Sequence, residues 1–450
     1  MTRIMKAKHI DMTEGSISRN LLVYAIPLIL GDFLQQLYNT TDSIIVGNFV
    51  GKQGLAAVGQ SSYIVNAVLG LFLGISLGCT VLVSRAFGSK NRELLSNVVD
   101  TIIKLTFILA VFFTLFGILM LPVFLRITSP SPDAYADCNR YLSIYFWGIS
   151  AQVFYNMSAG LLRAVGDSRS PLYVLIITAI LNASLDFLLV GVIKMGVAGA
   201  ALATIIAQYI SAVILSILIL RSPVFGKNIL LRKPIDKSVV LEVFKIGIPY
   251  GLQRSIVSLS NTVVNSFINQ FGSGAMAGWS VWAKLDQFSI TTMNNMGAAL
   301  TTFTAQNIGA GKYDRLRKGM RTDLIICLAV TYIYGIIFSV FSKHIVSLFN
   351  QDSEVLFYGS WILTVFFPIQ PLNTIQHVYS SSLRARGNSV YPMIATLFCF
   401  VLVRQAFLHI IWNYHPEFQM ILVSYIGTWC LCNIANWAAY RFYMQRTKIV

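Results

Sequence analysis

The chain has 450 residues, of which 56% are apolar and only 12% carry a charged side chain. Soluble domains carry about a quarter charged residues, and a soluble surface could not be covered from a composition this apolar. Together with a mean hydropathy of +0.67, this composition excludes an ordinary soluble protein and predicts one that lies in a membrane.

The apolar stretches are each long enough to cross a bilayer as a helix, which takes about 20 residues. The period-2 alternation of barrel strands is missing, and lipid otherwise admits only helices. We therefore predict an all-α membrane protein with about twelve transmembrane helices. In chain order they cover 20–47, 56–85, 98–123, 138–162, 171–193, 197–220, 240–269, 276–306, 320–347, 355–382, 391–412 and 419–443.

The net charge is +16, and the positive residues are distributed unevenly between the loops on the two sides of the membrane. Most Lys and Arg residues fall in alternate loops, whereas the opposite loops hold only Lys52, Arg126, Lys194 and Lys343. By the positive-inside rule this bias puts both termini in the cytoplasm, and it predicts a lipid bilayer rather than nucleic acid as the partner. Residues 1–19 are polar, so no cleavable signal is expected.

The two halves of the chain repeat each other. Ile26-Pro27 returns as Ile248-Pro249, and LLRAVGDSRSP at 161–171 returns as SLRARGNSVYP at 382–392. A near-constant spacing across several helices indicates duplication. Six crossings per half predict two lobes, 1–220 and 239–450, joined by a cytoplasmic linker at 221–238 and related by a pseudo-two-fold axis along the membrane normal.

Four expected helices of the first half carry polar stripes, because residues three, four or seven apart share a helix face. Such stripes must face the bundle interior or water. The stripe residues are Gln35, Tyr38, Asn39 and Asp42; Tyr141, Tyr145, Gln152 and Asn156; Asn182 and Asp186; and Thr204, Gln208 and Ser211.

Two acids, Asp42 and Asp186, therefore converge on one predicted pocket. An acid inside a membrane marks a functional site by default, although the two could also hold helices together by hydrogen bonds. Carboxylates and neutral oxygens suit a hard cation, and a close pair of carboxylates can share one proton. We expect an ion site here.

The second half differs, since Val264 and Phe407 stand where Asp42 and Asp186 would recur. Asp286 could form an ion pair with Lys284 or an arginine, and His377 could line a cavity or join helices. The further polar candidates of this half are Arg254, Ser258, Asn261, Asn265, Gln370, Asn373, Arg404 and His409.

Two short motifs match those of enzymes, but the residues around each motif do not fit an enzyme. GISLG at 74–78 fits G-x-S-x-G, but it lies in an apolar run rather than at a strand–turn–helix elbow. GAGK at 309–312 ends in Tyr313 where a phosphate-binding loop needs Ser or Thr. We expect no enzymatic activity, and energy must then come from an ion gradient or a partner.

Several segments, in order and duplicated, carry a family resemblance. They are IPLILGDFLQQLYNTTDSIIVG, GLAAVGQ, VSRAFGSKN, LLRAVGDSRSP, LNASLDFLLV, GVAGAALATIIAQ and TFTAQNIGAGKYDR. Over nearly its whole length the chain resembles the multidrug and toxic compound extrusion (MATE) family of secondary transporters. The match is closest to the bacterial and archaeal branch with acids in the first lobe.

The resemblance implies export of small amphipathic organic compounds in exchange for H⁺ or Na⁺ by a rocking, two-lobed monomer in the bacterial cytoplasmic membrane. It implies a cation site at Asp42, Tyr141, Asn156, Asn182, Asp186 and Thr204, with Na⁺ at Asp42, Asn182 and Asp186, and no other metal or cofactor. Cavity-lining candidates are Gln35, Tyr38, Asn39, Gln152, Arg254, Asn261, Asn265, Asn373 and His377. A flippase for a lipid-linked or anionic amphiphile remains open because of Arg254, Lys284 and Arg404, as does a scaffold that transports nothing.

Overall fold

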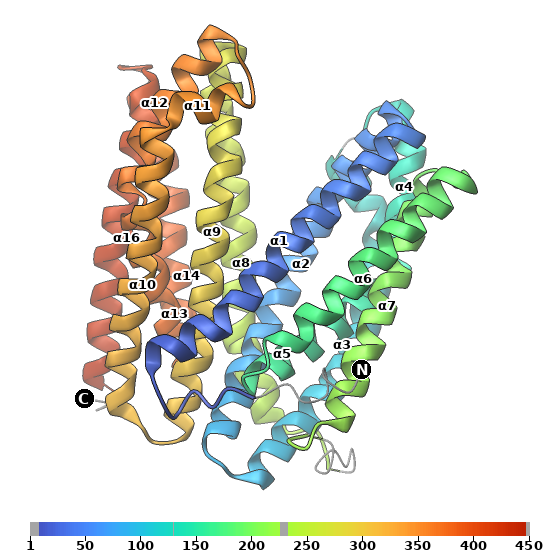
Figure 1. Cartoon of the computed structure of the whole chain (residues 1–450), viewed down its shortest axis with the longest axis vertical. Helices are drawn as coiled ribbons and strands as arrows, with labels where there is room; N and C mark the ends of the chain where they lie inside the picture. The colour runs from blue at the N-terminus through green and yellow to red at the C-terminus, as the bar shows by residue number, and fades with distance from the viewer. Residues whose placement is uncertain (1–8, 129, 226–232, 447–450) are drawn as a thin grey trace. The chain divides into compact units, whose positions relative to one another are not determined.

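The computed structural model describes residues 9–128, 130–225 and 233–446, with side chains through 443. Every regular element in this part of the chain is a helix (Figure 1). The predicted linker 221–238 lies in part outside the described residues. The prediction of an all-α fold is confirmed.

The first half contains seven α-helices and one π-helical segment among the residues described. They are α1 (Ile17–Phe49), α2 (Lys52–Gly88), α3 (Arg92–Thr128), α4 (Pro132–Trp147), α5 (Ile149–Ala164), α6 (Arg169–Asp186), the π-helix η2 (Phe187–Val192) and α7 (Val197–Arg221).

The second half follows the same plan in the described chain. Its elements are α8 (Lys237–Ile268), the short 3₁₀-helix η3 (Asn269–Phe271), α9 (Gly272–Gly309), α10 (Tyr313–Val340), α11 (Ser342–Ser347), α12 (Ser353–Ile369), α13 (Pro371–Ala385), α14 (Val390–Leu397), the π-helix η4 (Phe398–Val403), α15 (Arg404–Trp412) and α16 (Phe418–Arg446).

Within the described residues, 8 helical segments are long and apolar enough to cross a membrane, and the bent pair α12–α13 makes up to 9. The pair α4–α5 and the long helices α8 and α9 occupy the other predicted spans. The expectation of about twelve crossings is consistent with this arrangement. Three predicted single helices are broken: 138–162 at Gly148, 355–382 by a 45° bend at Gln370, and 320–347 at Phe341.

Pro371 follows the second break directly and starts α13, a position at which proline costs no helical hydrogen bond. Pro27 and Pro249 instead lie inside α1 and α8, where each removes a backbone donor without ending the helix. Neighbouring helices and local adjustments tolerate such prolines in membrane helices.

Close helix packing depends on small residues, as expected where lipid gives no hydrophobic drive for helices to associate. A Cβ added to Gly278 on α9 would lie 2.7 Å from the backbone nitrogen of Gly359 on α12. Real Cβ atoms do not come so close to a backbone, so only glycine allows α9 and α12 this approach.

The chain divides into two compact units. Unit 1 is Met1–Asp11 with Ile26–Gly247, and unit 2 is Met12–Ala25 with Ile248–Val450. Each division falls just before the Ile-Pro repeat, so the first turns of α1 group with unit 2 and those of α8 with unit 1. The sequence placed these boundaries instead at 220 and 239.

Contacts inside the units account for this grouping. Met12 N–H donates to Gln306 Oε1 at 3.0 Å, and the Tyr24 and Thr302 hydroxyls are 3.0 Å apart, all within unit 2. Each unit also has its own apolar core: one joins α2 to α5 and α7, and the other joins α9, α12 and α16.

Candidate functional site

The two acids predicted for the ion site meet inside unit 1. Asp42 on α1 is 8% exposed and Asp186, the last residue of α6, is 0% exposed. Their carboxyl groups lie within electrostatic reach of each other. Asp42 Oδ1 and both carboxyl oxygens of Asp186 are buried with no hydrogen-bond partner among the described atoms. Buried carboxylates in this state attract a proton or a cation.

Local sequence explains how the acids come together. Asp42 lies one turn beyond Tyr38 on the polar stripe of α1, and Asp186 lies one turn beyond Asn182 on α6. The π-helix η2 starts at Phe187, directly after Asp186. π-Helical turns are rare and are frequent at functional sites, so this placement adds independent weight to Asp186.

A shell of hydroxyl groups surrounds the acids. The Tyr38 hydroxyl donates to Thr204 Oγ1 on α7 at 3.3 Å. Tyr38 and Tyr141 both lie within electrostatic reach of Asp42 and Asp186. The Tyr141 ring stacks on Tyr145, with ring centres 6.4 Å apart. Tyr141, predicted for the ion site, and Tyr38, predicted to line the cavity, therefore lie near the pair, and Thr204, also predicted for the ion site, contacts Tyr38.

The other predicted ligands are placed differently. Asn182 is buried and its Nδ2 has no partner in the described structure, so its amide is available to the site. Asn156 is buried, but its Nδ2 donates to the backbone oxygen of Gln152 at 2.8 Å on its own helix. The hydrogen bond that the structure shows for this amide therefore lies within α5.

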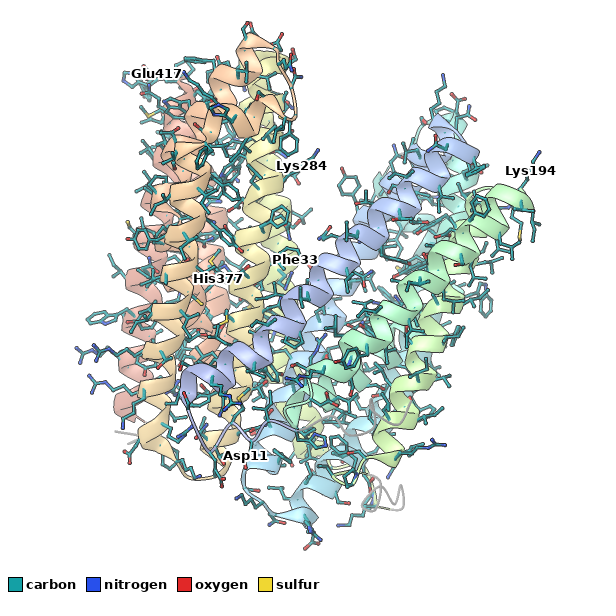
Figure 2. The ribbon with its side chains drawn as sticks, viewed as in Figure 1. Asp11, Phe33, Lys194, Lys284, His377 and Glu417 are labelled. Atoms are coloured by element: carbon teal, nitrogen blue, oxygen red, sulfur yellow. The ribbon has the colours of Figure 1, made fainter. Side chains whose placement is uncertain are left out.

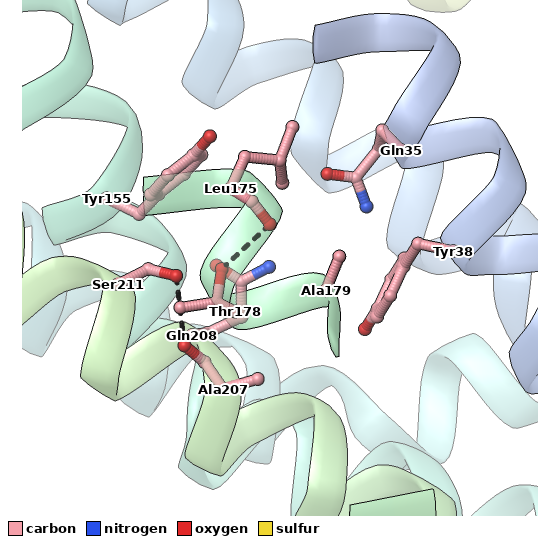
Figure 3. A pocket seen from close by; sticks show the side chains of 9 residues that line it. All are labelled: Gln35, Tyr38, Tyr155, Leu175, Thr178, Ala179, Ala207, Gln208 and Ser211. Atoms are coloured by element: carbon pink, nitrogen blue, oxygen red, sulfur yellow. Dashed lines mark hydrogen bonds between the residues drawn. The ribbon is translucent and has the colours of Figure 1, made fainter. Parts of the chain in front are cut away.

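A pocket lies within unit 1 (Figure 3). Tyr38 lines it, and Figure 3 shows its ring beside Ala179. The lining residues are Gln35, Tyr38, Tyr155, Leu175, Thr178, Ala179, Ala207, Gln208 and Ser211. Because Tyr38 both lines this pocket and lies within electrostatic reach of Asp42 and Asp186, it connects the pocket to the acid pair.

Not every cavity-lining candidate of the first half reaches this pocket. Gln35 and Tyr38 line it, whereas Asn39 is exposed and accepts a 3.5 Å hydrogen bond from Gln35. Gln152 is half-buried and is absent from the lining. The polar stripe of α1 was thus a good guide to the pocket, and that of the α4–α5 pair was a weaker one.

The candidates of the second half lie in unit 2. Arg254 and Asn261 on α8 are exposed and Asn265 is half-buried, whereas Asn373 on α13 is buried. His377, also on α13, is half-buried (Figure 2). Exposed polar side chains on a membrane-spanning helix must face water or protein rather than lipid.

The expected ion pair of Asp286 is absent from the described residues. Asp286 on α9 accepts a 2.5 Å hydrogen bond from Gln370 Nε2 instead. The ammonium of Lys284 lies 5.7 Å from the ring centre of Phe349, and Figure 2 shows this lysine extending from α9. Consecutive positions differ by about 100° on a helix, so Lys284 and Asp286 project on nearly opposite sides.

Sequence reasoning missed two further buried acids. Asp100 on α3 and Asp323 on α10 are 1% and 0% exposed, and their carboxyl oxygens have no hydrogen-bond partner among the described atoms. The internal repeat could have revealed them, because D-T-I-I at 100–103 returns as D-L-I-I at 323–326. Each acid lies in the early turns of its helix, away from the Asp42–Asp186 pair in sequence.

The residues around Asp42 and Asp186 limit which ions this pair can bind. The described residues contain no group of three or more His, Cys, Asp or Glu side chains that could hold a metal ion. Two carboxylates with neighbouring hydroxyl and amide groups suit a proton or a hard monovalent cation rather than a transition metal.

Membrane-spanning helices in two duplicated halves, with a buried acid pair and a polar pocket, define a multi-pass membrane transporter built from internal repeats. A family model described as MatE matches residues 27–188 and 249–410, more than half of the chain. The chain belongs to the MatE family, and the resemblance inferred from its motifs is confirmed.

Individual relatives agree with this assignment. The "Probable multidrug resistance protein YoeA" of Bacillus subtilis is 26% identical over 445 residues, which cover 97% of this chain and 96% of the relative. The "FAD transporter" of Shewanella oneidensis is 23% identical over 408 residues, 89% of each chain. A solved structure named "Crystal structure of MATE in the bent conformation" has a TM-score of 0.90 at 20% identity and 98% coverage of both chains. At this identity the likeness shows the fold.

Proposed function

We propose that the protein is a secondary active antiporter that exports small amphipathic organic compounds in exchange for H⁺ or Na⁺. The observation that carries the proposal is the pair Asp42–Asp186, buried in a membrane protein with three carboxyl oxygens that lack a partner in the described structure. Such a pair costs free energy unless it holds a proton or a cation.

The pair would bind the cation from outside and release it inside as the protein alternates between two states. A proton that enters yields about 1.4 kcal/mol per pH unit and about 2.3 kcal/mol per 100 mV of membrane potential. One ion could therefore drive a compound against a concentration gradient of more than tenfold. The positive-inside bias supports cytoplasmic termini, and we propose that the protein works as a monomer in the bacterial cytoplasmic membrane.

The pocket in unit 1 supports coupling between the ion and the exported compound. Tyr38, which lies within electrostatic reach of both acids, contributes its ring to the pocket and its hydroxyl to Thr204. Loading of Asp42 and Asp186 would change the charge near this tyrosine. A change in the packing of α1 would then alter the pocket, which is how an ion site can bias substrate release.

Flux in proteoliposomes tests this function. Vesicles receive a pH jump or a sodium jump, and movement of ethidium or of flavin mononucleotide is followed by fluorescence. We expect the wild type to move at least one of these dyes in response to a jump. Asp42→Asn and Asp186→Asn should reduce that response by at least tenfold, because the amide cannot release a proton or bind a cation with equal strength.

The matched control is Asp32→Asn, which changes an exposed acid on the same helix. It should keep the response if the buried pair carries the coupling. Unchanged gradient-driven flux in the Asp42→Asn and Asp186→Asn variants, or no response in the wild type, would contradict the proposal.

A lipid-linked or anionic amphiphile is the second candidate cargo. Arg254 and Lys284 are exposed on membrane-spanning helices of unit 2, and basic groups there favour a negatively charged ligand. Names among the relatives include both a multidrug resistance protein and an FAD transporter, so family membership leaves the charge of the substrate undetermined.

A further inference from the structure

Two arginines contact Tyr250 in unit 2, and a histidine lies near both arginines. Arg254 Nη1, one turn further along α8, donates to the Tyr250 hydroxyl at 3.2 Å. The guanidinium carbon of Arg384, near the end of α13, lies 4.7 Å from the centre of the Tyr250 ring. His377 lies within electrostatic reach of both arginines, and it shares a face of α13 with Arg384 because seven residues make nearly two turns.

The buried member of this cluster has no negatively charged partner among the residues that the structure describes. Arg384 is 6% exposed, and its hydrogen bond in the described structure runs from Nη2 to Ser381 Oγ at 2.9 Å. The groups that act on it electrostatically are Tyr250 and Arg254, and neither is an acid. A buried guanidinium costs several kcal/mol unless it is paired, and a cation–π contact returns only about 2 kcal/mol of that.

The duplicated half of the chain provides an internal comparison. From the Ile-Pro and Leu-Arg-Ala repeats, Arg384 corresponds to Arg163 and His377 to Asn156. Arg254 corresponds to Asp32. In unit 1, Asp32 and Arg163 both lie within electrostatic reach of Tyr155. The first half therefore places an acid near the equivalent arginine, and the second half replaces that acid with a second arginine.

We propose that Arg254, Arg384 and His377 form a subsite for the phosphate or carboxylate group of an amphipathic organic anion. The inference rests on the proposed transport function and names its substrate class. Guanidinium groups bind phosphate and carboxylate through paired hydrogen bonds, and Arg384 has donors that Ser381 does not use. The exposed side chain of Arg254 gives a ligand access, and Tyr250 offers an aromatic surface beside the charge.

The surroundings of Arg384 differ from those expected of an arginine with a purely structural role. Arginines that only set topology stay solvated in the cytoplasmic loops, where charge is cheap to hold. Arg384 is instead buried beside a second arginine, and like charges in low dielectric repel. An anion bound between them would relieve both the repulsion and the cost of burial.

Binding of two flavins to the purified full-length protein tests the subsite. Riboflavin and flavin mononucleotide share a fluorescent aromatic ring system and differ by one phosphate group. Fluorescence anisotropy in phosphatidylcholine nanodiscs should show that the wild type binds flavin mononucleotide at least tenfold more tightly than riboflavin. Equal affinities, or no binding of flavin mononucleotide, would overturn the proposal.

Arg254→Asp is the decisive variant, because it places an acid at the position where the first half of the chain has Asp32. It should reduce the preference for the phosphorylated flavin at least fivefold. Lys343→Gln removes an exposed positive charge from α11, outside the cluster, and should keep the preference. An equal loss in both variants would show only a general effect of charge and would overturn the subsite.

Added phosphatidylglycerol separates two sources of the phosphate group. Competition between this lipid and flavin mononucleotide in the wild type, lost in Arg254→Asp, identifies a lipid headgroup as a ligand, whereas no competition identifies a soluble anion. Both results support the subsite. The ratio of the two flavin affinities is measured without an ion gradient. Equal affinities would therefore not contradict Asp42-dependent transport, and a lack of transport would not change what the affinity ratio shows about the subsite.

Discussion

The hydroxyl of Tyr38 donates to the hydroxyl of Thr204 across 3.3 Å, and this contact ties α1 to α7 beside the buried acids. A neutral hydrogen bond of this kind contributes about 0.5–1.5 kcal/mol. We expect Tyr38→Phe to raise the half-saturating concentration of the coupling ion by about threefold to tenfold, because the ring stays in place while α1 loses its link to α7.

The measurement is flux in proteoliposomes as a function of pH or of sodium concentration. Thr204→Val removes the same hydrogen bond from the other side and should give a similar shift. Tyr63→Phe alters a tyrosine that is 74% exposed and should leave the ion dependence unchanged. If Tyr38→Phe and Thr204→Val both behave like the wild type, this contact has no part in coupling.

Close approach of α2 to the start of α8 gives a stability prediction. A Cβ added to Gly78 would lie 2.4 Å from the carbonyl oxygen of Val243, a backbone atom that cannot turn aside. Gly78→Ala should therefore destabilise unit 1 by about 1–3 kcal/mol. The midpoint of thermal unfolding in detergent measures the change.

Gly59→Ala is the matched control on the same helix. Nothing lies within 4 Å of a Cβ at Gly59, so the exchange should stabilise α2 by up to about 1 kcal/mol through helix propensity. A lower midpoint for Gly59→Ala, or an unchanged one for Gly78→Ala, would contradict the packing described here.

The positions of most helices and the duplication of the chain can be predicted from patterns in the sequence. Apolar runs locate most helices, and the repeats of Ile-Pro and Leu-Arg-Ala reveal the duplication. The polar stripe of α1 identifies the face that carries Asp42, since helical periodicity fixes which residues share a face. Periodicity does not tell which helices are neighbours, so the meeting of Asp42 with Asp186 needed the fold.

Other features depend on packing that no local pattern records. The π-helix after Asp186 is made of Phe, Leu, Val and Gly, which would serve equally well in an α-helix. The amide of Asn156 is on the predicted face, yet it bonds to its own helix. Asp286 meets Gln370 rather than Lys284 because α9 and the α12–α13 bend lie against each other, a tertiary contact between residues far apart in the chain.

A carboxyl group outside the membrane-spanning segments gives a pH prediction. Asp236, just before α8, accepts hydrogen bonds from the Ser238 hydroxyl at 2.6 Å and from Asn97 Nδ2 on α3 at 2.8 Å. The bond from Ser238, followed by that from Asn97, lowers the pKa of Asp236 below its ordinary value.

A lowered folded-state pKa stabilises the protein above the unfolded value of about 3.9, and this contribution disappears as the pH falls through the folded value. The stability difference between wild type and Asp236→Asn should thus be constant from pH 7 to about 5, decrease as the pH falls below about 3.9, and disappear once the pH is below the lowered folded pKa. Unfolding midpoints over this range measure it. Ser238→Ala should shift the loss to higher pH, and a difference that grows on acidification would contradict the argument.

Arg404 in unit 2 is 1% exposed, and its guanidinium carbon lies 3.9 Å from the ring centre of Tyr425 and 4.7 Å from that of Phe400. Nε and Nη2 donate to Thr428 Oγ1 at 3.3 and 3.0 Å. Aromatic faces and a hydroxyl thus surround a buried cation. A desolvated cation–π contact contributes about 2 kcal/mol, so Tyr425 should stabilise the fold partly through Arg404.

A double-mutant cycle tests this coupling. Tyr425→Leu should destabilise the protein by about 2–4 kcal/mol, from lost packing and from a cation left without its ring. In an Arg404→Met background the same exchange should cost about 1–2 kcal/mol less, because no charge remains to be compensated. Tyr425→Phe keeps the ring face and should retain the coupling. Strictly additive unfolding free energies for Arg404→Met and Tyr425→Leu would show that the ring only fills space.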